Sequence, residues 1–193
     1  MKSLLKISTI AIGVASLVIT GCKSNESASG YENVMSMYSL REIFKYGELN
    51  AMDYPAYVKE TFGITKVDTW YGGFPKDEVD NPEFYAKLKQ RADEAGVEIF
   101  LLMAGAVDVR SNDPAELKAE AEKFFVDVDR AVMLGSSFVR VFVKAPKADR
   151  DVALNNAVTA LEVLSDYAQT KGIVLAIEPG ASDWTKDGTC LLY

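Results

Sequence analysis

The segment Lys171-Gly172-Ile173-Val174-Leu175-Ala176-Ile177-Glu178 joins a glycine, five consecutive apolar residues and one carboxylate. A continuous apolar run, unlike an alternating one, is typical of a strand that is buried on both faces, as in a parallel sheet. Gly172 can adopt the left-handed conformation that commonly ends a helix. We therefore expect a helix that ends at Gly172, followed by a buried strand that carries Glu178 at its carboxyl end.

The same pattern occurs upstream at intervals of roughly 30–40 residues, the size of a strand–helix unit. Strands alternating with helices predict a parallel sheet with right-handed crossovers. The expected strands are Val34–Leu40, Lys66–Tyr71, Val97–Met103, Phe138–Val143 and Ile173–Glu178. The expected helices run from Asp53 to Gly63, from Asn81-Pro82 to Gly96, from Asp113-Pro114 to Gly135, with Glu116 completing a capping box, and from Asp149 to Lys171.

Two architectures fit this alternation, a doubly wound sheet and a barrel. No predicted strand is followed by Gly-x-Gly-x-x-Gly, so a dinucleotide-binding fold has no support. The hydrophobic periodicity does not decide further.

Five motifs, in order along the chain, favour the barrel. They are Met37-Tyr38-Ser39-Leu40, Phe62-Gly63-Ile64-Thr65-Lys66-Val67-Asp68-Thr69-Trp70, Ala95-Gly96-Val97-Glu98-Ile99, the segment 131–142 that ends in Phe138-Val139-Arg140-Val141-Phe142, and Lys171–Glu178. Together they resemble the xylose isomerase-like TIM barrels of the sugar phosphate isomerase/epimerase type, over about residues 33–189. The resemblance implies an α/β fold of the (β/α)8 TIM-barrel type.

The barrel is expected to be incomplete. A whole TIM barrel takes about 250 residues, whereas this chain has 193. The resemblance covers about the first five strands and four helices, which places a partial barrel over residues 33–193. A five-strand piece would leave an unpaired strand edge that is open to self-association.

The resemblance implies isomerisation or epimerisation of sugars or cyclitols through an enediolate that a divalent metal stabilises. Relatives commonly take their metal ligands, Glu, Asp, His and Glu, from strands five to eight. Only Glu178 has a counterpart in this chain, as metal ligand and possible catalytic base. The chain has no histidine, and Pro179-Gly180 follows Glu178 where many relatives have Asn-His. We therefore expect no isomerase activity from this chain alone, and the identity of the metal stays open.

Four further side chains are candidates for the substrate site. Arg140 lies in mid-strand among valines, so it needs either an anionic ligand or an ion-pair partner such as Asp68 or Glu178. Both interpretations stay open. Tyr38, Trp70 and Tyr71 lie where strands end and would either wall a sugar pocket or belong to the core.

The first residues resemble the signal peptide of a bacterial lipoprotein. A basic start is followed by an apolar run from Ile7 to Ile19, too short for a comfortable transmembrane helix, and then by Leu17-Val18-Ile19-Thr20-Gly21-Cys22. We expect residues 1–21 to be the signal peptide, Cys22 to be lipidated, and residues 22–32 to be a flexible tether. This predicts export and a lipid anchor on the periplasmic side, and Lys23 favours the outer membrane. The alternative is a plain cleaved signal with an incidental cysteine.

The formal net charge is −7, and removal of the signal peptide would take away two lysines and make the protein more acidic. Such a charge argues against nucleic-acid binding, because it repels phosphate backbones. Three functions remain distinct. The first is a fragment of a lipid-anchored sugar isomerase or epimerase, and the second is a non-catalytic sugar-binding or scaffold lipoprotein that pairs with another chain. The third, an apurinic-site endonuclease, is disfavoured by export, acidity and the lack of histidine.

Overall fold

The computed structural model describes residues 32–145 and 150–178. Cys22 and the predicted signal peptide and tether, apart from Glu32, lie outside the described residues. None of the described helices is sufficiently long and apolar to cross a membrane.

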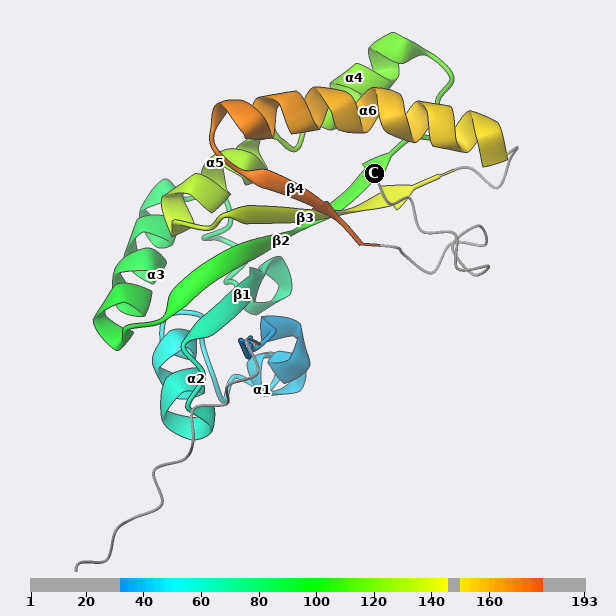
Figure 1. Cartoon of the computed structure of the whole chain (residues 1–193). Helices are drawn as coiled ribbons and strands as arrows, with labels where there is room; N and C mark the ends of the chain where they lie inside the picture. Colours follow the sequence, from blue (N-terminus) through cyan, green and yellow to red (C-terminus); the bar gives the residue numbers. More distant parts are fainter. Residues whose placement is uncertain (1–31, 146–149, 179–193) are drawn as a thin grey trace, which may run out of the picture. The chain divides into compact units, whose positions relative to one another are not determined.

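The centre of the fold is a parallel sheet in which the strands follow one another in chain order (Figure 1). The strands are β1 (Lys66–Trp70), β2 (Glu98–Asp108), β3 (Phe138–Lys144) and β4 (Val174–Ile177). The predicted α/β fold of partial TIM-barrel type is therefore confirmed. β2 is longer than its apolar run suggested, because it continues through Ala104–Asp108 to pair with the end of β3.

The connecting helices begin and end close to the predicted residues. They are α2 (Tyr54–Phe62), α3 (Pro82–Ala95), α4 (Pro114–Glu122), α5 (Phe125–Leu134) and α6 (Arg150–Thr170). The Asn81 side chain accepts a hydrogen bond from the Glu83 backbone N–H at the start of α3. Gly96 adopts φ +65° directly after that helix, in the left-handed region that a side chain would strain.

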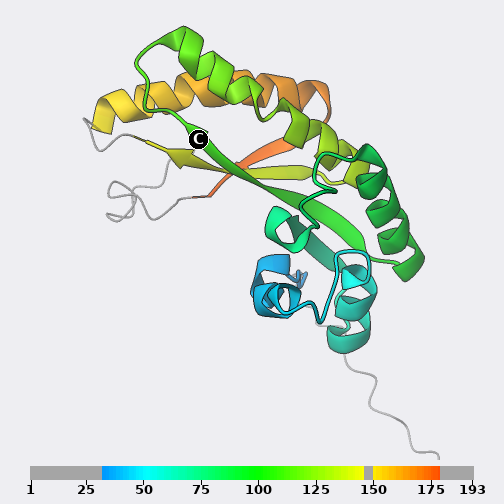
Figure 2. The same cartoon turned by 180° about the vertical axis from the view of Figure 1, so that it is seen from behind.

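The two faces of the sheet have different surroundings. Helices α3 to α6 lie along one face (Figures 1 and 2), and the side chains of Leu102, Val139 and Val141 that point toward them are fully buried. Trp70, Met103, Arg140 and Ala176 lie in register across the four strands, and all four are only partly buried. Successive residues of a strand point to opposite faces, so this row lies on the face away from the helices.

The first predicted strand is wrong in extent. Instead of a strand over 34–40, the chain makes one parallel bridge between Met35 and Val67 and then turns into a short 3-10 helix (Met37–Leu40, η1) and α1 (Arg41–Lys45). The physical cause is a side chain that replaces the backbone hydrogen bonds between strands: the Met37 backbone N–H donates to the Asp68 carboxylate, Oδ1, at 2.7 Å. The strand pairing ends there, at the point where Tyr38 is positioned.

The predicted helix between Asp113 and Gly135 is two helices. α4 ends at Glu122, and the Phe124 backbone N–H bonds the Ala121 carbonyl in a tighter turn before α5 begins. The capping box at the start of α4 also differs, because Glu116 accepts from the Ser111 hydroxyl rather than from the Asp113 backbone. The Asp113 side chain itself caps the Ala115 N–H, as its position predicted.

Candidate functional site

A cavity of about 400 Å³ opens on the face of the sheet away from the helices. It brings together four of the five residues that the sequence proposed for substrate and metal, namely Tyr38, Trp70, Arg140 and Glu178. Ser36, Met103 and Phe142 complete its lining. The roles of the four residues stay predictions, but their convergence is a property of the fold.

The register of the sheet explains this convergence. Trp70 is paired with Met103, and Met103 with Arg140, so three lining residues stand side by side on neighbouring strands. Phe142 lies two residues after Arg140, and Glu178 lies two residues after Ala176, the residue of β4 that is paired with Arg140. Both side chains therefore point to the same face as the row. The Glu178 backbone N–H still bonds the Val141 carbonyl at 3.0 Å, so the carboxylate is anchored to the end of the sheet.

Arg140 and Glu178 form an ion pair across the cavity. Arg140 Nε lies 2.9 Å from Glu178 Oε2, with the arginine side chain 11% exposed and the glutamate side chain 49% exposed. The Nε–H is poorly aligned for a hydrogen bond, so this contact is chiefly electrostatic. Arg140 Nη1 donates to the Ala104 carbonyl at 3.2 Å, and the guanidinium lies over the Phe142 ring. Of the two open interpretations of Arg140, the ion pair is thus present in the fold.

Asp68 is a second carboxylate close to Arg140, and it is 6% exposed. Burial raises the pKa of Asp68 to about 6, although hydrogen bonds from Met37 and Ser36 and the charge of Arg140 oppose the shift. Burial likewise lowers the pKa of Arg140, and the charges of Glu178 and Asp68 counteract it. Both carboxylates therefore stabilise one partly buried cation.

An aromatic wall closes one side of the cavity. The rings of Tyr38 and Trp70 meet edge to face, with centroids 5.0 Å apart. The Trp70 backbone N–H points at Met37 Sδ, 3.4 Å away, so β1 holds both the tryptophan and the turn that carries Tyr38. Tyr38 is 49% exposed, and the Arg41 guanidinium lies over its ring.

Tyr71 does not contribute to this wall. As the residue after Trp70 it points the other way, and its hydroxyl donates to the carboxylate of Asp127 on α5, beside Arg130. Burial, followed by the charge of Asp127, raises the pKa of Tyr71. Tyr71 belongs to a polar contact between η2 (Tyr71–Gly73) and α5, so of its two open interpretations the structure shows packing within the fold.

The described residues do not by themselves fit a divalent metal. Among them no three Asp, Glu, His or Cys side chains are grouped to hold an ion. Asp68 is committed to the Met37 N–H, and the Arg140 guanidinium already neutralises Glu178 at 2.9 Å. A metal on Glu178 would have to displace that guanidinium or share the carboxylate with it.

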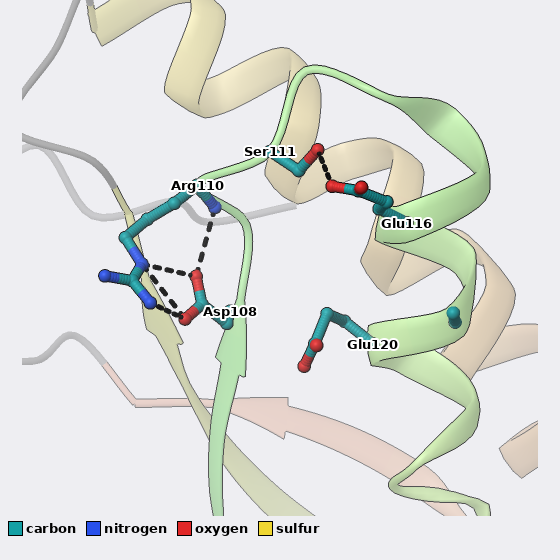
Figure 3. Close-up of a pocket in the computed structure, with 6 residues that line it drawn as sticks. Asp108, Arg110, Ser111, Glu116 and Glu120 are labelled. Atoms are coloured by element: carbon teal, nitrogen blue, oxygen red, sulfur yellow. Dashed lines mark hydrogen bonds and ion pairs between the residues drawn. The ribbon is translucent and has the colours of Figure 1, made fainter.

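A second cavity, of about 460 Å³, lies between the end of β2 and the start of α4 (Figure 3). Its charged side chains are satisfied within the chain: Arg110 holds Asp108 through two of its nitrogens, and Ser111 donates to Glu116. The Arg110 side chain lowers the pKa of Asp108 to about 2. No strong sequence signal pointed to this cavity. Because its charged side chains pair with one another, few are available to bind a ligand.

The sequence analysis missed part of the first cavity. Ser36, Met103 and Phe142 were not singled out, and Asp68 was named only as a possible partner of Arg140. A signal for Phe142 existed, because it follows Arg140 by two residues in one strand and so shares its face. Met103 could be found only from the register between β2 and β3.

Similar structures share the fold at low sequence identity. A sugar phosphate isomerase/epimerase from Parabacteroides distasonis is 20% identical, with a TM-score of 0.57 over 78% of this chain and 55% of that one. The IOLI protein with a binding zinc atom is 16% identical, with a TM-score of 0.57 over 77% and 51% of the two chains. The probable 3-DHS dehydratase AsbF from Bacillus anthracis is 12% identical, with a TM-score of 0.58 over 76% and 52%. At these identities the likeness shows the fold alone.

The chain spans about half the length of these solved structures. No curated protein sequence matches it significantly. Residues 56–191 match the family described as xylose isomerase-like TIM barrel. Because that match covers well over half of the chain, the protein belongs to the xylose isomerase-like TIM barrel family.

Proposed function

We propose that the chain carries the sugar-binding part of an isomerase or epimerase site, with a sugar or cyclitol as substrate. The observation that supports this most is the cavity in which Tyr38, Trp70, Arg140 and Glu178 meet. Its aromatic faces suit ring C–H groups, and its ion pair offers both a donor and an acceptor to hydroxyls. The names of similar structures, which include a sugar phosphate isomerase/epimerase and a D-psicose 3-epimerase, agree with this class of ligand.

In this proposal Glu178 is the group that moves a proton. Its carboxylate is half exposed at the cavity, so it can accept a proton from a carbon next to a substrate carbonyl. Arg140 would donate to the oxygen on which negative charge develops. One similar structure contains a zinc atom, but a metal-dependent reaction in this protein would need ligands beyond those of the described residues.

We expect the chain from Cys22 to Tyr193 to bind D-fructose without converting it, with or without added Mn²⁺. Binding should quench tryptophan fluorescence, because Trp70 lines the cavity. The quench should survive in Trp184→Phe and vanish in Trp70→Phe, since these are the two tryptophans of the chain. Metal-dependent turnover by this chain alone would contradict the proposal that Glu178 and Arg140 need further metal ligands to complete the reaction.

A second candidate is a non-catalytic sugar-binding or scaffold protein that pairs with a second copy of itself. Among the described residues, β4 pairs only with β3, and Val174 on β4 is 55% exposed. An unpaired strand edge is a template for another chain. Size-exclusion chromatography with light scattering should then show a defined dimer that Val174→Lys dissociates, whereas a monomer at all concentrations would exclude this candidate.

We also propose that the protein is exported and lipid-anchored through Cys22, on the periplasmic side of the bacterial envelope. The support is the order of basic start, apolar run, small residues and cysteine. Cys22→Ser should abolish incorporation of labelled fatty acid and move the protein from the membrane to the soluble fraction. Cys190→Ser is the matched control, and equal membrane association of both variants would refute the anchor.

A further inference from the structure

We propose that the cavity selects an uncharged polyol and discriminates against its phosphate ester. This inference rests on the proposed sugar-binding function and narrows its substrate class. It does not follow from the fold, because similar structures include proteins named as sugar phosphate isomerases/epimerases and one named as a D-psicose epimerase.

The charge of the cavity lining is the first argument. Its seven residues contain one cation, Arg140, and one anion, Glu178, which neutralise each other at 2.9 Å. Asp68 behind the lining adds a second carboxylate within electrostatic range of Arg140. Among the described residues, a bound phosphate dianion would therefore meet no net positive charge at this site.

The geometry of Arg140 is the second argument. Phosphate recognition by arginine commonly uses two parallel N–H groups of a free guanidinium edge. In this cavity Nε faces Glu178, Nη1 donates to the Ala104 carbonyl, and the flat face lies over Phe142. A phosphate paired with the Nε edge would have to displace Glu178, and one paired with the Nη edge would have to share Nη1 with the Ala104 carbonyl, whereas a hydroxyl or carbonyl oxygen needs a single N–H.

Among the described residues, the neighbouring cations do not supply the missing charge. Arg41 lies over the Tyr38 ring, but its guanidinium donates to the Tyr38 carbonyl and faces Glu42, and it does not line the cavity. Lys144, two residues after Phe142, lies 3.6 Å from Asp108 and does not line the cavity. Arg110 is likewise held by Asp108. The remaining lining residues offer what an uncharged polyol uses: the rings of Tyr38 and Trp70, and the oxygen of the Ser36 hydroxyl, which itself bonds Asp68.

The test compares D-fructose with D-fructose 1-phosphate, in which O6 stays free to close the same pyranose ring, by tryptophan fluorescence and calorimetry on the mature chain. We expect D-fructose to bind at least about tenfold more tightly. Glu178→Gln should narrow or reverse this ratio, because it frees the guanidinium while keeping the shape of the side chain. Glu98→Gln is the matched control. Glu98 is 51% exposed and pairs with Lys66 at the opposite end of the sheet, so this substitution removes one negative charge outside the cavity.

Each outcome of this comparison either supports or overturns the inference. Tighter binding of D-fructose by the wild-type protein and by Glu98→Gln, with the ratio changed only in Glu178→Gln, supports the inference. Equal or tighter binding of the 1-phosphate by the wild-type protein overturns the inference and leaves the proposed sugar-binding function intact. Failure of both ligands to bind overturns the proposed function and the inference with it.

Discussion

Replacing Arg140 with methionine is expected to abolish sugar binding and to lower the free energy of unfolding by about 2–3 kcal/mol. The guanidinium is the cation shared by Asp68 and Glu178, and its side chain is 11% exposed. Glu178 can turn toward water because it is half exposed, but Asp68 cannot. The loss of stability therefore comes chiefly from leaving Asp68 buried without its cation.

Urea unfolding and fluorescence titration with D-fructose measure the two effects. Arg110→Met is the control, because Arg110 also pairs with an aspartate but on the surface. We expect that variant to keep the wild-type unfolding midpoint and sugar affinity. An Arg140→Met protein as stable as the wild type would show that the ion pair adds nothing to the fold.

The positions of the helices could be predicted because their signals are local. Gly63, Gly96 and Gly135 end the helices before them, and each adopts a positive φ near 65°. The first strand could not be predicted in the same way, because its extent depends on a contact 31 residues away. There the Asp68 carboxylate takes the Met37 N–H that a longer strand would have given to the β1 backbone.

Several residues that line the cavity could be predicted from the sequence, but their arrangement in space could not. The rule that strand ends carry the chemistry of a barrel pointed to Tyr38, Trp70 and Glu178. It could not separate Trp70, the last residue of β1, from Tyr71, which begins η2 and bonds Asp127 on α5. The row Trp70–Met103–Arg140 depends on the register of three strands, and the register shifts between Val67 and Asp68 in β1. Such a shift leaves no mark in the sequence.

Replacing Asp68 with alanine is the second change from which we expect a large effect, about 2 kcal/mol of stability together with loss of sugar binding. The variant leaves the buried Met37 N–H without its acceptor. It also releases the 3-10 turn that carries Tyr38, so the edge-to-face contact with Trp70 is lost. Trp70 should then become more exposed, which a red shift of its fluorescence emission would report in a Trp184→Phe background.

Asp68→Asn separates the hydrogen bond from the charge, since an amide oxygen can still accept from Met37. The pKa of Asp68 is about 6 in the folded protein, against about 3.9 in an unfolded chain. Between these values the folded state binds the extra proton, so this group makes the wild-type protein less stable as pH rises from about 4 to about 6. In Asp68→Asn that decrease, up to about 3 kcal/mol, should be absent, while the Trp70 emission stays that of the wild type. If Asp68→Asn and Asp68→Ala instead lose stability and shift emission equally at pH 7, the charge of Asp68, and not its hold on Met37, positions the aromatic wall.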